Sequence, residues 1–178
     1  MKTRSVLTLA FAVAAAVVGA VWLKSLVPPA SPTGSLAFLS AAPSLPIADR
    51  EGRKIDLSKA KGKLLIVHFW ATWCPPCVEE VPSLSRFWDK YRNRDDIVLY
   101  AISVNKTWQE IDAFNAKIPN RLPLYIDPDA STAKRFGTVQ YPETYIVNKS
   151  GRVLERVPGG VSWDNPEVQK RIDQLLAS

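Results

Sequence analysis

The chain has 178 residues, with 23 basic and 17 acidic side chains, one histidine and two cysteines. This length accommodates one domain with a tail, and two cysteines are too few for a disulfide-rich secreted scaffold. Two cysteines and one histidine also cannot complete a four-ligand structural zinc site without carboxylates. Residues 1–30 hold three basic side chains and no acidic one, which leaves 20 basic and 17 acidic residues in the remainder. That net charge of +3 gives no reason to expect a nucleic-acid partner.

The N-terminal residues predict a membrane segment, because residues 5–23 contain no charged side chain. As a helix they would span about 28 Å, close to the hydrocarbon thickness of about 30 Å. Lys2 and Arg4 precede this segment, so the positive-inside rule predicts that residues 1–4 are cytoplasmic and the remainder extracytoplasmic. We expect a single-pass anchor in the inner (cytoplasmic) membrane with the body in the periplasm. The alternative is a signal peptide cleaved after Ala20, which delivers the body to the same side.

Residues 24–42 are rich in Pro, Ser and Ala and predict a tether, because prolines remove backbone donors and favour extended chain. Residues 43–178 form the body, in which periodicity and turn residues predict alternating strands and helices. In chain order, the expected elements are a buried strand at 64–70, a helix from 74 to about 90, a buried strand at 97–104, a helix at 107–117, a short strand at 122–126, a short helix at 129–136, two strands at 144–147 and 153–157 joined by a tight turn, and a terminal helix at 168–176. This order indicates an α/β sandwich with a mixed sheet.

The residues with redox chemistry lie directly after the first buried strand, in the motif Trp73-Cys74-Pro75-Pro76-Cys77. Two cysteines separated by two residues at the start of a helix are typical of a redox pair. Cys74 would sit at the helix N-terminus, where free N–H groups and the helix dipole stabilise a thiolate, so we expect it to be the nucleophile. Cys77, one turn later, would resolve the mixed disulfide. The alternatives are an inert disulfide, which would stabilise little because it closes a very short loop, or half of a metal site.

The stretch Phe-Trp-Ala-Thr-Trp-Cys-Pro-Pro-Cys at 69–77 resembles the active site of the thioredoxin fold. It is most similar to that of the membrane-tethered TlpA/ResA-type thiol–disulfide oxidoreductases, which include the cytochrome c maturation reductants. Residues 49–58 resemble that family's N-terminal hairpin, Glu80 matches a position in its active-site helix, and 137–145 resembles its cis-proline segment. The resemblance covers residues 43–178. It implies a thioredoxin fold, with a mixed central sheet flanked by helices and an N-terminal hairpin.

The resemblance also implies roles for residues around the two cysteines. Pro142 is expected to follow a cis peptide bond, which would set the Tyr141 backbone against the Cys74 sulfur, ready to pair with a substrate chain. Trp73 is expected to shield the disulfide. These residues would form the surface that binds a disulfide-containing protein.

Two ionisable residues are further candidates. In the resembling family a glutamate at the Glu80 position is linked to cysteine protonation, and a nearby carboxylate raises a thiol pKa. The alternative is that Glu80 and the adjacent Glu79 form a solvated surface pair. His68 occupies a position where thioredoxins carry a buried aspartate and the tethered relatives often an asparagine. Its imidazole is either a neutral core group or a proton carrier for Cys77.

The direction of electron flow follows from the stability of the thiolate. Pro75 and Pro76 remove two N–H donors beside Cys74, and Glu80 adds an opposing negative charge. Both effects raise the thiol pKa, so we expect a reductant. The family resemblance implies that it reduces partner proteins such as apocytochrome c, receives electrons from a membrane thiol donor and needs no cofactor or metal.

Two other functional classes fit less well. A thiol peroxidase of the peroxiredoxin type would carry Pro-x-x-x-Thr-x-x-Cys, which the residues before Cys74 do not match. A copper-site assembly module would need Cys-x-x-x-Cys and a downstream histidine, whereas this chain has one spacer fewer and its His68 lies upstream.

Overall fold

The computed structural model of the protein describes residues 44–56 and 60–178. The predicted anchor at 5–23 and the predicted tether at 24–42 lie outside these ranges. No helix in the described ranges combines the length and the apolar character that crossing a membrane would require.

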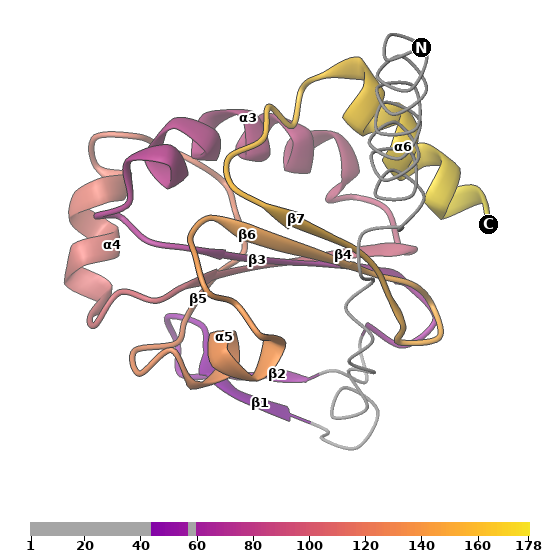
Figure 1. Ribbon diagram of the computed structural model, residues 1–178. Helices are drawn as coiled ribbons and strands as arrows, with labels where there is room; N and C mark the ends of the chain where they lie inside the picture. The colour runs from indigo at the N-terminus through magenta and orange to yellow at the C-terminus, as the bar shows by residue number, and fades with distance from the viewer. Residues whose placement is uncertain (1–43, 57–59) are drawn as a thin grey trace, which may run out of the picture. The chain divides into compact units, whose positions relative to one another are not determined.

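The centre of the described part is a mixed sheet with the strand order β2-β1-β5-β4-β3-β6-β7 (Figure 1). The strands are β1 (Ser44–Ala48), β2 (Lys54–Asp56), β3 (Leu64–Trp70), β4 (Ile97–Ser103), β5 (Leu124–Ile126), β6 (Glu143–Val147) and β7 (Val153–Pro158). Strand β3 pairs in parallel with β4 and antiparallel with β6. All seven residues of β3 are buried, as expected for a central strand covered on both faces.

Helices cover both faces of this sheet. They are α3 (Pro75–Tyr91), α4 (Trp108–Asn115), α5 (Ser131–Phe136) and α6 (Pro166–Ala177). Helices α3 and α6 lie on one side of the sheet, and the short α5 lies on the other (Figure 1). Helix α4 begins with the predicted capping box, in which the Thr107 backbone N–H donates to Glu110 at 2.8 Å.

The alternation of side chains along β3 decides which groups face α3. The ring of Phe69 packs edge-on against Phe136 of α5, with centroids 5.2 Å apart. Successive residues of a strand point to opposite faces, so His68 lies on the face covered by α3. Its register partner on β6 is Thr144, which shares that face.

The predicted elements from 64 onwards are confirmed, with end points that differ by a few residues. The last helix starts two residues earlier than predicted, at Pro166, because Asn165 caps it by accepting from the Glu167 N–H at 2.9 Å. The hairpin implied by the resemblance is formed by β1 and β2. Its turn is held by Asp49, whose carboxylate accepts from the Arg53 backbone N–H at 2.8 Å.

Candidate active site

The two cysteines form a disulfide at the start of α3, with Cα atoms 5.2 Å apart. Cys74 is the N-cap residue of the helix, and Pro75 and Pro76 occupy its first turn. The Cys77 backbone N–H points at the Cys74 sulfur, with an N–S distance of 3.4 Å. Cys77 has no solvent exposure, whereas Cys74 keeps a small exposed area. A partner disulfide can therefore approach only Cys74.

The turn that leads into the motif is held by Asn105, a buried residue just after β4. Its side-chain oxygen accepts from the Thr72 N–H at 2.9 Å, and its amide donates to the Thr72 hydroxyl at 2.7 Å. Ser103 adds a hydrogen bond to the same oxygen at 2.7 Å. Sequence reasoning missed Asn105. One signal could have found it: Asn105 is a polar residue directly after a buried parallel strand. The carboxyl ends of such strands form the edge of the sheet where α/β proteins place their sites.

The segment 137–142 leads into β6, which pairs with β3 on the edge opposite to β4. The Tyr141–Pro142 peptide bond is cis, as the resemblance implied. The Tyr141 ring packs edge-on against Trp73, with centroids 6.0 Å apart. Trp73 and Val139 are 61% and 84% exposed, the large apolar side chains most open to solvent among the described residues. Trp73, directly before Cys74, and Tyr141 thus form an apolar contact beside the motif, and Val139 is exposed two residues before Tyr141 in the same segment.

An ion-paired group holds both ends of the 137–142 segment. Glu143, which follows the cis-proline, is wholly buried and accepts from Arg156 Nε at 2.7 Å and from the Tyr145 hydroxyl at 2.9 Å. The same guanidinium donates to the Gly137 carbonyl at 3.1 Å. The Tyr145 hydroxyl lies 3.2 Å from the Thr138 hydroxyl. These contacts fix the position of the loop, and sequence reasoning did not find them.

Glu80 lies in the interior, so its interpretation as a solvated surface residue is wrong. Its side chain is 4% exposed, whereas Glu79 faces solvent. Residues three apart share a helix face, so Glu80 follows Cys77 on the buried side of α3. Burial raises the pKa of the Glu80 carboxyl to about 7, and hydrogen bonding to the Trp163 indole N–H opposes this rise. A buried carboxyl that titrates near neutral pH one turn from a redox cysteine is able to influence its protonation.

His68 is fully buried on β3, and its Nδ1 lies 2.9 Å from the Thr144 hydroxyl. Its Nε2 has no hydrogen-bond partner among the described residues. Burial lowers the pKa of the imidazole to about 3. The ring is therefore neutral at physiological pH, which favours the core interpretation over proton transfer through an imidazolium.

The described residues gather no group of three or more histidine, cysteine, aspartate or glutamate side chains able to hold a metal ion. What they bring together is a cysteine pair at a helix N-terminus, a cis-proline segment and a buried carboxyl on a mixed sheet. This combination defines a site for thiol–disulfide exchange.

The comparisons with known proteins agree with this site. Residues 39–156 match the model of the AhpC/TSA family, and the chain belongs to that family. It is 30% identical over 118 residues to the thiol-disulfide oxidoreductase ResA of Bacillus thuringiensis subsp. konkukian (strain 97-27), covering 66% of this chain and 68% of the relative. It is 27% identical over 125 residues to ResA of Bacillus subtilis (strain 168), covering 70% of this chain and 69% of the relative.

A solved thiol:disulfide interchange protein of the thioredoxin family from Chlorobium tepidum TLS superimposes with a TM-score of 0.62. Its sequence identity is 23%, over 76% of this chain and 94% of that chain. The predicted thioredoxin-like fold is thus confirmed. The protein is a ResA-like thiol–disulfide oxidoreductase that acts on disulfide-containing substrates.

Proposed function

We propose that the protein is an extracytoplasmic reductant that uses the Cys-Pro-Pro-Cys dithiol to reduce disulfides in partner proteins, with apocytochrome c as the expected substrate. The observation that carries this proposal is the first turn of α3. Pro75 and Pro76 occupy it and supply no N–H group to a Cys74 thiolate. Strongly oxidising dithiols owe their potential to a stabilised thiolate, so a poorly stabilised one favours the reducing direction.

Glu80 strengthens this direction in the proposal. Its carboxyl lies one turn after Cys77 on the same helix face, and a negative charge there opposes formation of a thiolate. Both features disfavour the reduced, ionised form of the pair. The disulfide is then hard to reduce, and the dithiol gives up its electrons readily.

The reaction proceeds through two exchanges of bonds. The Cys74 thiolate attacks one sulfur of the partner disulfide, forms a mixed disulfide and releases a partner thiolate. Cys77 loses its proton and attacks the Cys74 sulfur, which breaks the mixed disulfide and releases the second partner thiolate. Two electrons reach the partner and the protein ends as the Cys74–Cys77 disulfide. A membrane thiol donor restores the dithiol by the same chemistry in reverse.

Three neighbouring residues serve these steps in the proposal. The backbone of Tyr141, held before cis-Pro142, pairs with the substrate chain next to Cys74, and Trp73 covers the substrate side of the disulfide. His68 acts as a neutral group on the face of β3 that α3 covers. Its partnerless Nε2 is available to accept a hydrogen bond from the Cys77 thiol.

Two measurements test the direction and the substrate. Equilibration against glutathione buffers is expected to give a potential at or below about −200 mV, whereas a value near about −120 mV would exclude the reductant function. The Cys77→Ser variant leaves the mixed disulfide unresolved, so it is expected to trap apocytochrome c. The Cys74→Ser variant is the control and traps nothing. Recovery of unrelated proteins in place of apocytochrome c would refute the substrate assignment.

The location belongs to the same proposal, with residues 5–23 as an anchor in the cytoplasmic membrane and the catalytic domain on the periplasmic side. The charge-free stretch after Lys2 and Arg4 supports it. Mass measurement of the protein isolated from membranes is expected to give the full chain. A mature product that begins at Val21 would rule out the anchor.

Exchange is favoured over the two alternative functions. Val67 and Ala71 stand where the peroxidase pattern before Cys74 has Pro and Thr. Curated relatives are named as thiol–disulfide oxidoreductases. Peroxide consumption and copper titration are both expected to give no signal above that of the Cys74→Ser variant.

A further inference from the structure

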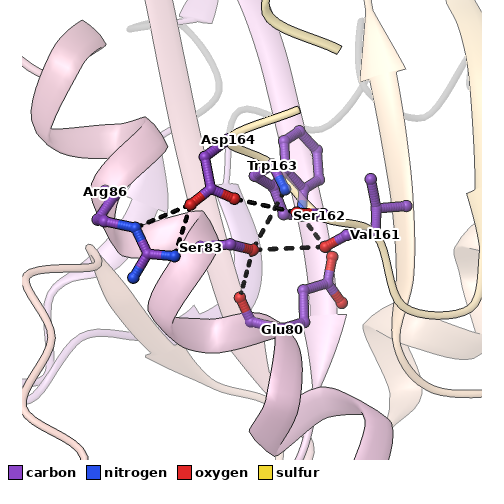
Figure 2. A network of polar contacts seen from close by, with 7 residues as sticks. All are labelled: Glu80, Ser83, Arg86, Val161, Ser162, Trp163 and Asp164. Atoms are coloured by element: carbon purple, nitrogen blue, oxygen red, sulfur yellow. Dashed lines mark hydrogen bonds and ion pairs between the residues drawn. The ribbon is translucent and has the colours of Figure 1, made fainter. Parts of the chain in front are cut away.

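The segment 159–164, which follows β7, runs alongside the first half of α3. A Cβ atom at Gly160 would lie only 3.5 Å from the carbonyl oxygen of Pro76, in the redox motif. One turn beyond Glu80 in the helix, the Ser83 hydroxyl donates to the Glu80 carbonyl at 2.9 Å and lies 3.4 Å from the Val161 carbonyl oxygen. The Trp163 backbone N–H donates to the same hydroxyl at 3.2 Å. Figure 2 shows this group, in which the side chain of Ser83 points from α3 toward the segment.

The segment contributes one polar side chain that reaches the Glu80 carboxyl. The Trp163 indole Nε1–H donates to Oε1 of Glu80, while Oε2 is buried with no partner among the described residues. The indole itself is buried and packs against Phe87, with ring centroids 5.1 Å apart. Its orientation is therefore fixed by packing. Because an indole N–H can only donate, this contact is strongest when the carboxyl is ionised.

We propose that Trp163 is a positioning residue for the exchange reaction: its indole N–H holds the Glu80 carboxyl beside Cys77 and favours the ionised form. It is the side-chain donor to this carboxyl, to which the Val161 backbone adds a weaker hydrogen bond, and it then tunes the pH dependence of disulfide exchange. The inference rests on the proposed role of Glu80 in that reaction. Trp163 lies 83 positions from Glu80 in the chain. In this inference it takes no part in the bond exchange at the cysteines and acts only through the Glu80 carboxyl.

Burial and the hydrogen bonds from Trp163 and the Val161 backbone set the pKa of Glu80, with no charged side chain among the causes. The ionisable groups on the elements packed around it are Cys77 and Glu79 on α3, His68 on β3, Asp164 in the 159–164 segment, Glu155 on β7, and Arg171 and Asp173 on α6. Asp164 is paired with Arg86 at 2.5 Å, Glu155 with Arg171 at 2.6 Å, and Asp173 with the Tyr91 hydroxyl at 2.7 Å.

His68 and Cys77 are the groups nearest to Glu80 in chain or sheet position whose own titration has to be distinguished from that of the carboxyl. Burial lowers the pKa of His68 to about 3, so the imidazole is neutral wherever the carboxyl titrates. Cys77 carries no charge in the disulfide form, and in the dithiol its ionisation is told apart from that of Glu80 by the Glu80→Gln variant. The Trp163 N–H is thus the side-chain donor to a carboxyl whose pKa burial raises to about 7.

The test is the pH profile of disulfide reduction by the wild type and the Trp163→Phe, Glu80→Gln and double variants. Phenylalanine keeps an aromatic ring in the pocket and removes the donor together with part of the indole's volume, a loss that the double variant, in the Glu80→Gln background, also carries. We expect the inflection that Glu80→Gln abolishes to move upward by about one pH unit in Trp163→Phe, as loss of one hydrogen bond to a charged group predicts. The double variant is expected to reproduce the profile of Glu80→Gln. Trp88→Phe, the same exchange on a half-buried tryptophan of α3, is the matched control and should leave the profile unchanged.

The outcomes separate the two proposals. A Glu80→Gln profile identical to that of the wild type would overturn the role of Glu80 itself. An inflection that disappears in Glu80→Gln but stays in place in Trp163→Phe would leave that role intact and overturn the inference about Trp163. If Trp163→Phe does not fold, NMR of the wild type decides: the indole N–H resonance of Trp163 must titrate together with the Glu80 carboxyl. A resonance that is independent of pH across that range would refute the inference.

Discussion

Removal of Arg156 on β7 should destabilise the protein far more than removal of an exposed arginine on α6 that pairs with the same strand. In the Arg156–Glu143 pair the side chains are 31% and 0% exposed, and their N–O distance is 2.7 Å. Truncation to methionine in Arg156→Met would leave a carboxylate in the interior with only the Tyr145 hydroxyl as a partner. Breaking a buried pair in this way costs about 3–5 kcal/mol. We expect about 3 kcal/mol, the lower end of that range, because one hydrogen bond remains and the guanidinium is partly solvated.

Guanidinium denaturation of the oxidised protein measures this loss, and thermal unfolding should show a midpoint lower by about 10 °C for a domain of this size. Arg171→Met is the matched control. The Arg171–Glu155 pair has an N–O distance of 2.6 Å, with side chains 51% and 30% exposed. Exposed pairs contribute about 0.2–1 kcal/mol, so the control should barely move the unfolding midpoint.

The double variant Arg156→Met/Glu143→Gln separates a stranded charge from lost packing. Glutamine removes the buried negative charge while keeping the shape of the side chain. If the loss in Arg156→Met comes from the uncompensated carboxylate, the double variant should be more stable than Arg156→Met alone. Additive destabilisation by the two substitutions, or equal effects of Arg156→Met and Arg171→Met, would refute the reasoning.

Three further predictions concern the site. His68→Asn should slow exchange while leaving the fold intact, and an unchanged exchange rate would show that His68 serves only as a core residue. Alkylation of the reduced protein at graded pH should label Cys74 before Cys77, and the reverse order would exchange the nucleophile and the resolving thiol. The folded-state pKa of Glu80 lies above its unfolded value of 4.5, so wild-type stability relative to Glu80→Gln should fall as the pH rises from 4.5 through about 7. Parallel pH–stability curves for the two proteins would contradict the burial of this carboxyl.

The parts of the site that sequence reasoning found are those encoded locally. The cysteine spacing, the prolines of the first turn and the buried strand before them lie within fourteen consecutive positions, 64–77. Local signals of this kind fix a strand, a helix N-terminus and the residue at its cap. Pro142 is distant in the chain, and its cis bond followed only from the family resemblance, since cis bonds are the minority form of X–Pro bonds.

The residues that sequence reasoning missed depend on contacts between distant segments. Asn105 reaches Thr72 across 33 positions and Trp163 reaches Glu80 across 83. A lone asparagine or tryptophan carries no spacing signal, because its role depends on which strand end or helix face the fold brings beside it. For His68 the sequence left two interpretations open. Burial between β6 and α3 favours the neutral ring, since desolvation disfavours the charged form.

The disulfide is held differently on its two sides. On the protein side, Asn105 holds the turn before the motif and Trp163 donates to Glu80 of the motif's helix, so polar groups from distant segments support the residues on either side of the cysteines. On the solvent side, the prominent exposed groups are the apolar side chains of Trp73 and Val139. A partner chain that covers them removes apolar surface from water, which is favourable for many sequences and requires no defined motif. In the proposed function, the restriction on the partners of the reductant comes from where it is held, which is the role that the predicted anchor would serve.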